Sequence, residues 1–239
     1  MKKAIYYIFL VLLLAVMGTA GIMLYREIRI GQKEQAVFDT IVEEIYEETS
    51  DYAAPTPPPS KIKQLKERYP DITGWIKIEG TVIDYPVVHT PGHTEKYLRM
   101  DLDGNYARSG VPFLDGRVHL DSPHLLIYGH NMLNGTMFSD LTKYENRNFA
   151  KENDEIILSL AEEERRYRIF AVIETDGSDN WYRALTFATD EQYQKQVEGL
   201  SNRSMFDGQL PEAKAQLLTL STCSGARQQK RLLVIAARI

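Results

Sequence analysis

Cys223 is the only cysteine in a chain of 239 residues, and it closes the peptide Leu218–Cys223 at the end of a predicted strand. A free thiol has a pKa of about 8.5, so only a few per cent is the nucleophilic thiolate at neutral pH. Cysteine is also a common small buried apolar residue, which is the alternative here. A catalytic role therefore requires a cationic neighbour and an acid–base group nearby.

Arg231 is the candidate for the cationic neighbour. The polar connection between strand 215–223 and strand 231–238 is short enough to join them as an antiparallel hairpin. That pairing sets Arg231 beside Cys223, where a guanidinium could stabilise a thiolate or an oxyanion on a substrate carbonyl. The alternative is an arginine that begins a strand at the solvent surface.

His130 is the candidate for general acid/base. It ends the apolar segment 124–130, and Gly129 before it allows another segment to approach closely. Histidine changes protonation near pH 6.5, which suits proton transfer. No group of residues has zinc-ligand spacing, so neither a metal nor another cofactor is expected. The remaining histidines are expected to be satisfied surface residues: His89, His93, His119 and His124.

The amino terminus predicts a membrane anchor. Residues 4–25 carry no charge, and at ~1.5 Å per residue these 22 positions form a helix of roughly 33 Å, enough to cross a bilayer core. Lys2 and Lys3 precede it, as in a signal anchor, although cleavage near 18–21 stays open. We expect a single-pass protein of the cell membrane whose large carboxy-terminal part is extracellular.

Three segments follow from this pattern. Residues 1–25 form the cytoplasmic tip and transmembrane anchor, residues 26–59 a linker, and residues 60–239 the catalytic domain. The linker holds three basic and eight acidic side chains, with an amphipathic helix over 33–49 and a Pro-rich spacer over 53–59. That helix could dock on its own domain or self-associate. Neither the linker nor the domain has a basic patch, which argues against nucleic-acid binding.

Short strands dominate the domain. Runs rich in β-branched and aromatic residues alternate with turn sequences, which predicts a mainly β barrel or sandwich with helices on its rim. Helices are expected from Ser60 to Tyr69, at 136–144 with Thr136 as cap, and at 190–202 with Asp190 as cap. The predicted strands are 74–79, 82–88, 111–114, 124–130, 155–161, 166–175, 215–223 and 231–238.

These motifs together resemble those of the sortases, and most closely class B. The resemblance rests on Thr219–Cys223 followed by Arg231, with Tyr128–Asn131 upstream, and it covers roughly residues 61–239. Further matching segments are Gly74–Ile76, Asp84–Val88, Tyr97–Leu98, Gly110–Asp115 and Met137–Phe138.

The resemblance implies an eight-stranded sortase-type β-barrel and a cysteine transpeptidase. Cys223 would attack the carbonyl of a threonine in a sorting motif near the carboxyl end of a surface protein. His130 would act as general acid/base and Arg231 would hold the oxyanion. An amine of a peptidoglycan precursor, or of a pilin, would release the acyl chain.

Four residues are expected to contact substrate by the same resemblance: Ser221, Tyr128, Leu98 and Tyr182. Two departures from the class leave the sorting motif undefined. Ser224 and Gly225 follow the cysteine where acidic residues are common, and no Asp-Asn pair precedes Tyr97–Leu98.

Two alternatives to cell-wall anchoring or pilus assembly stay open. One is a secreted cysteine peptidase, in which water resolves the thioester. The other is a membrane-tethered binding module with a buried thiol, which thiol labelling of the folded protein would distinguish.

Overall fold

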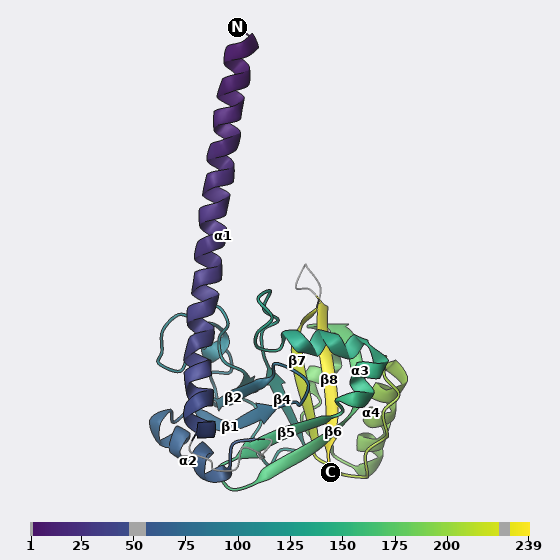
Figure 1. Cartoon of the computed structure of the whole chain (residues 1–239). Helices are drawn as coiled ribbons and strands as arrows, with labels where there is room; N and C mark the ends of the chain where they lie inside the picture. The colour runs from purple at the N-terminus through teal and green to yellow at the C-terminus, as the bar shows by residue number, and fades with distance from the viewer. Residues whose placement is uncertain (1, 48–55, 225–229) are drawn as a thin grey trace.

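The computed structural model describes residues 2–47, 56–224 and 230–239, but not the side chains of residues 2–5, 27, 47, 223 and 224. Within these residues, eight strands close into a barrel in the order β1-β2-β3-β4-β7-β8-β6-β5 (Figure 1). The strands are β1 (Ile72–Lys77), β2 (Asp84–His89), β3 (Phe113–Leu114), β4 (His124–Tyr128), β5 (Glu155–Leu160), β6 (Glu164–Asp176), β7 (Leu217–Ser224) and β8 (Lys230–Arg238). The predicted mainly β barrel is confirmed, and the sandwich alternative is wrong.

The barrel is mixed in direction. β2 pairs with β3 and β4 pairs with β7 in parallel, while the other neighbours are antiparallel. The parallel pair β4–β7 makes both strands end at the same rim, and β8 begins there because it returns antiparallel to β7. At this rim, therefore, the last residues of β4 and β7 lie beside the first residues of β8.

β8 shows why the central strands are apolar throughout. Leu232, Val234 and Ala236 belong to the core inside the barrel, whereas Leu233 and Ile235 belong to a second core on its outer face. The second core is covered by α4 (Asp190–Arg203) through Tyr193, Val197 and Leu200. A strand buried on both faces lacks the polar alternation of a half-exposed strand.

Helices cover the outside and ends of the barrel. The structure contains helical segments at three places where none was predicted: η1, α3 and η3. The helices besides α4 are α1 (Lys2–Glu47), α2 (Pro59–Arg68), η1 (Lys96–Arg99), η2 (Ser139–Glu145), α3 (Arg147–Glu152) and η3 (Asn180–Arg183).

The predicted helix caps are wrong in each case. α2 begins at Pro59, which needs no amide hydrogen at this position, so Ser60 lies inside the helix. Thr189 caps α4, because its Oγ1 accepts from the Gln192 amide at 3.2 Å. The segment after Thr136 is a 3-10 helix that starts at Ser139.

α1 runs without interruption from the predicted anchor into the predicted linker (Figure 1). Its first part is long and apolar enough to cross a membrane, and that part is exposed. Its last part packs on the barrel through Phe38, Ile41 and Ile45, all of which are buried in the main core. Phe38 makes an edge-to-face contact with Tyr85 of β2, with ring centroids 5.5 Å apart. The amphipathic pattern thus corresponds to docking of the helix on its own domain.

The predicted Pro-rich spacer is only partly described, because residues 48–55 lie outside the described residues. Thr56 is buried and its Oγ1 donates to the Glu164 carboxylate at 2.7 Å. Pro57 is buried as well, and Pro59 already begins α2. Residues 56–59 are therefore packed against the domain and are not a free spacer.

Candidate active site

The candidate active site lies at the rim where β4 and β7 end and β8 begins. Cys223 pairs with Arg231 in the β7–β8 register, as the sequence predicted. Tyr128 pairs with Ser221 in the parallel β4–β7 register. The side chain of Cys223 and residues 225–229 lie outside the described residues.

The β4–β7 pairing continues beyond the last residue of β4. The Gly129 amide donates to the Ser221 carbonyl at 3.1 Å, and Thr222 Oγ1 donates to the Gly129 carbonyl at 2.8 Å. Continuing this register by one residue sets His130 opposite Cys223. His130, Cys223 and Arg231 therefore follow one line across three neighbouring strands.

Gly129 is required by the packing beneath this line. A Cβ at this position would lie 2.5 Å from the ring of Phe138, which is fully buried. Phe138 is held there because its amide donates to the His130 carbonyl at 2.9 Å. The glycine predicted to allow a close approach does so, and the approaching group is this ring.

The His130 imidazole is half-buried and has a defined orientation. Its Nε2 lies 2.8 Å from the Leu98 carbonyl in η1. A carbonyl can only accept, so Nε2 carries the proton and Nδ1 is the nitrogen left for proton exchange. Burial lowers the pKa of His130, and the positive charges of Arg99 and Arg231 lower it further against the hydrogen bond to Leu98.

The four residues predicted to contact substrate are brought together beside this line. The rings of Tyr128 and Tyr182 stack with centroids 6.2 Å apart, and the Tyr182 hydroxyl lies 2.9 Å from Ser221 Oγ. Leu98 supplies the carbonyl that holds His130. Strands β4 and β7, with η1 and η3, thus form one continuous surface around the rim.

An ion pair that the sequence did not reveal holds this surface. Asp115 is buried, and Arg117 donates to its two oxygens at 2.8 and 2.6 Å. Tyr128 donates to the same carboxylate at 3.0 Å, and Arg117 also donates to the Tyr182 carbonyl at 2.9 Å. Burial would raise the pKa of Asp115, but these hydrogen bonds outweigh burial and lower it. The sequence signal for this ion pair was Asp115 at the end of a predicted strand, followed two residues later by Arg117.

Two of the other histidines correct the expectation of satisfied surface residues. Among the described residues, the half-buried His89 has no hydrogen-bond partner for its Nε2, and His124 is fully buried. The Nδ1 of His124 lies 2.8 Å from the Ala184 carbonyl, and its Nε2 lies 2.8 Å from Thr219 Oγ1. Trp181 donates to the same Thr219 oxygen at 2.9 Å, so the histidine joins η3 to β4 and β7. Burial lowers the pKa of His124 to about 4. The sequence signal was its position at the start of an uninterrupted apolar run.

Known proteins share this architecture. The chain has the closed β-barrel of a cysteine acyl-transfer enzyme, with a cysteine strand, a histidine and an arginine meeting at one rim. The family model of the sortase domain matches residues 76–239, and the chain belongs to this family of transpeptidases. Among the described residues, no three His, Cys, Asp or Glu side chains are grouped to hold a metal ion.

The similarity is to sortase B in particular. Staphylococcus aureus sortase B is 29% identical over 181 residues, covering 74% of this chain and 73% of that protein. The structure of its complex with a substrate has a TM-score of 0.75 at 25% identity, covering 87% and 97% of the two chains. Clostridium perfringens sortase B has a TM-score of 0.68 at 32% identity, covering 74% and 98%. The chain is thus a sortase B-type cysteine transpeptidase.

Proposed function

We propose that this transpeptidase joins surface proteins to an amine of a cell-wall peptidoglycan precursor. The Cys223 thiolate attacks the carbonyl of a threonine in the sorting motif. The peptide bond breaks, the carboxyl-terminal fragment leaves as an amine, and the rest of the protein stays as a thioester on Cys223. The acceptor amine then attacks the thioester, an amide bond forms, and the thiolate is regenerated.

His130 and Arg231 supply the other two roles. Protonated His130 gives its Nδ1 proton to the leaving amine, and in the second half-reaction Nδ1 takes a proton from the incoming amine. Arg231 stabilises the negative charge that develops on the threonine carbonyl oxygen in both steps. The observation that carries this proposal is the pairing of Cys223 with Arg231 at the rim where β4 ends, two residues before His130.

The location follows from α1. We propose that residues 4–25 anchor the chain in the cell membrane as a single span, with the barrel outside the cell. The length and apolar character of the helix support this, and the solved complex of Staphylococcus aureus sortase B with a substrate supports a sorting-signal peptide as ligand.

A peptide screen tests the reaction. Peptides with varied sorting motifs are incubated with the enzyme, with and without glycine peptides, diamino-acid peptides or a pilin lysine peptide, and the products are read by mass spectrometry. The proposal expects an amide to a peptidoglycan-type amine at the expense of hydrolysis. Preferential joining to the pilin lysine would instead indicate pilus assembly, and hydrolysis unaffected by any amine would indicate a peptidase.

Two substitutions assign the roles. Cys223→Ala should abolish both cleavage and transfer, and undiminished turnover would contradict the nucleophile. Arg231→Lys should lower kcat by about 10²-fold, because an ammonium lacks the planar pair of donors that a guanidinium aims at the oxyanion. Arg147→Lys, on the exposed surface, is the matched control. Equal kcat in the two lysine variants would show that another donor holds the oxyanion.

A further inference from the structure

The loop 131–137 follows His130 directly and has a defined shape. Asn131 and Met137 form an antiparallel bridge at its base. Thr136 Oγ1 donates to Asn134 Oδ1 at 2.8 Å, and Gly135 and Met137 adopt positive φ angles of 80° and 57°. The loop is therefore an ordered projection from the active-site rim.

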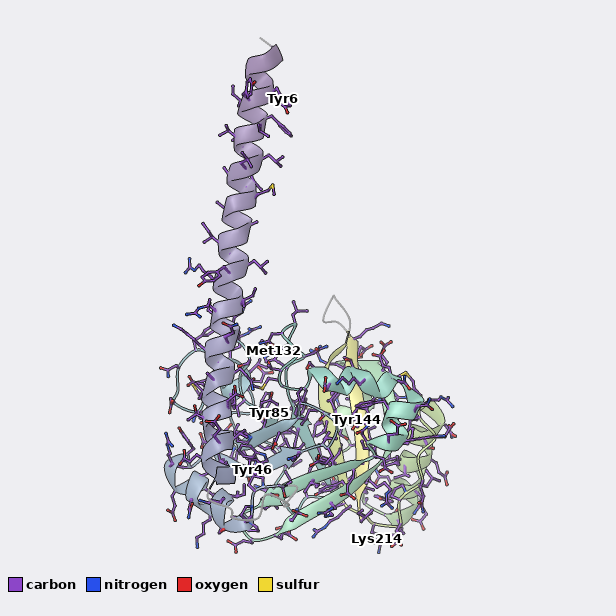
Figure 2. The ribbon with its side chains drawn as sticks, in the orientation of Figure 1. Tyr6, Tyr46, Tyr85, Met132, Tyr144 and Lys214 are labelled. Carbon is purple, nitrogen blue, oxygen red and sulfur yellow. The ribbon has the colours of Figure 1, made fainter. Side chains whose placement is uncertain are left out.

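This loop reaches α1. A Cβ built on Gly31 of α1 would lie only 3.0 Å from Asn134 Nδ2, so the tip of the loop touches the helix. In Figure 1 the teal loop rises from the rim toward the N-terminal half of α1, and the C-terminus lies at the opposite end of the barrel. Figure 2 shows the same polarity, with Met132 at the end from which α1 projects and Lys214 at the opposite end. The rim with the active site thus faces the side from which α1 projects.

The contact at Gly31 gives the height of the loop above the membrane. Gly31 is the sixth residue after Tyr25, which ends the uncharged segment, so it lies ~9 Å further along the helix axis. The headgroup layer on each side of a bilayer is about 5–8 Å thick. The tip of the loop is therefore level with the edge of the headgroups.

The side chains at this height suit such a surface. Leu133, next to Asn134, has a relative exposure of 108%, and Ile28 and Ile30 of α1 are exposed as well. A single exposed leucine is ordinary on a soluble surface, so its location is what distinguishes it. Basic residues on the same stretch of α1 can meet anionic headgroups: Arg26, Arg29 and Lys33.

We propose that loop 131–137 is a membrane-contacting element, in which Leu133 inserts into the headgroup layer of the bilayer that holds α1. The proposal rests on the anchoring by residues 4–25 proposed above. The partner is the lipid surface itself. Because the backbone of the loop is bonded to His130 at its base, the membrane contact seats the active-site rim at a fixed height and orientation over the bilayer.

A fluorescence experiment on the full chain tests this contact. The Leu133→Trp variant is reconstituted in phosphatidylcholine–phosphatidylglycerol vesicles, with and without lipids brominated on their acyl chains. The two native tryptophans, Trp75 and Trp181, are buried and give a constant background. Leu210→Trp is the matched control, because Leu210 is also exposed, at 49%, and lies in the same surface depression as Arg238 at the far rim.

The proposal expects blue-shifted emission and a loss of fluorescence in brominated vesicles for Leu133→Trp, beyond the loss seen in Leu210→Trp. Flotation of the same samples separates the possible failures. If the chain floats with the vesicles but both variants lose equal fluorescence, the loop contact is wrong and the anchor stands. If the chain does not float, the anchor and the loop contact are both wrong, while transfer to soluble amines still reports on the catalytic proposal.

Discussion

His130 is oriented by a single backbone contact, since Nε2 donates to the Leu98 carbonyl and leaves Nδ1 for the reaction. Its lowered pKa keeps the imidazole mostly neutral at pH 7, because burial and two nearby guanidinium groups disfavour the protonated ring. The proposed mechanism needs protonated His130 together with ionised Cys223, so only a small fraction of the protein is reactive at once, and Arg231 is the permanent cation beside the thiolate.

The Arg99→Ala substitution tests this electrostatic arrangement. Removing an exposed positive charge from the vicinity should raise the pKa of His130 toward the ordinary value near 6.5. Titration of the imidazole resonances by NMR gives the pKa, with exposed His119 as internal reference. An unchanged pKa in Arg99→Ala, equal to that in an Arg147→Ala control, would show that the charge of Arg99 does not act on His130.

Among the individual residues, the sequence predicted the pairing of Cys223 with Arg231 but not the buried roles of His124 and Asp115. Cys223 and Arg231 belong to adjacent strands of one hairpin, so their pairing follows from spacing. His124 was misjudged because its burial depends on η3, a segment with no periodic signal. The role of Asp115 depends on Tyr128 and Tyr182, which only the folded barrel brings near it.

Among the elements, η3 is fastened to the barrel by polar contacts on several sides. Arg117 holds its backbone from one side and His124 from the other, while Trp181 reaches Thr219 of β7. Tyr182 owes its position beside Ser221 to these contacts. A buried network of this kind is costly when any member changes its charge.

Acid should therefore destabilise the protein through His124. The pKa of His124 is about 4 in the folded protein and near 6.5 in the unfolded chain. As the pH falls, the unfolded chain is therefore protonated at His124 before the folded protein is. The stabilising contribution is complete above pH 6.5 and is lost as the pH falls toward 4, by about 2 kcal/mol between pH 7 and pH 5.

Urea unfolding at the two pH values measures this loss. His124→Gln should reduce the difference between the unfolding free energies at pH 7 and pH 5, because glutamine does not titrate. His93→Gln, at an exposed position, should keep the difference of the unsubstituted protein. If both variants retain the full difference, another group is responsible for the acid sensitivity.

The strands were predicted within a few residues because each is an apolar, β-branched run bounded by turn residues. The shortest elements carry no such pattern in the sequence. η1 and η3 have four residues each and follow from tertiary contacts, such as the bond of the Val111 amide to the Tyr97 carbonyl. The predicted helix caps were displaced by one or two residues: the polar neighbour Thr189 caps α4, while Pro58 and Phe138, which have no capping side chain, precede α2 and η2.

For the molecule as a whole, α1 is both the proposed membrane anchor and part of the folded core. Glu34 accepts hydrogen bonds from the amides of Arg108 and Ser109 at 2.8 and 3.0 Å. At the other end of the docked segment, the Tyr46 hydroxyl reaches the Asp84 carboxylate at 3.3 Å. We propose that the folded unit begins near Glu34, well before residue 60.

Phe38→Ala tests this boundary. Truncating a buried aromatic side chain should lower the free energy of unfolding by about 3 kcal/mol, through lost burial and the cavity beside Tyr85. Urea unfolding in detergent can follow Trp75, which is buried and bonded to Asp84. Glu43→Ala, on the exposed face of the same helix, should change the free energy little. Equal midpoints for the two variants would mean that the helix is attached without stabilising the barrel.

The parallel pairing of β4 with β7 also has a consequence for the timing of folding. The bond from Thr222 to Gly129 joins residues 93 positions apart, and closing so long a loop is an entropically slow event. The proposed active site is therefore complete only when β7 has paired with both β4 and β8, so a partly folded chain stays chemically silent.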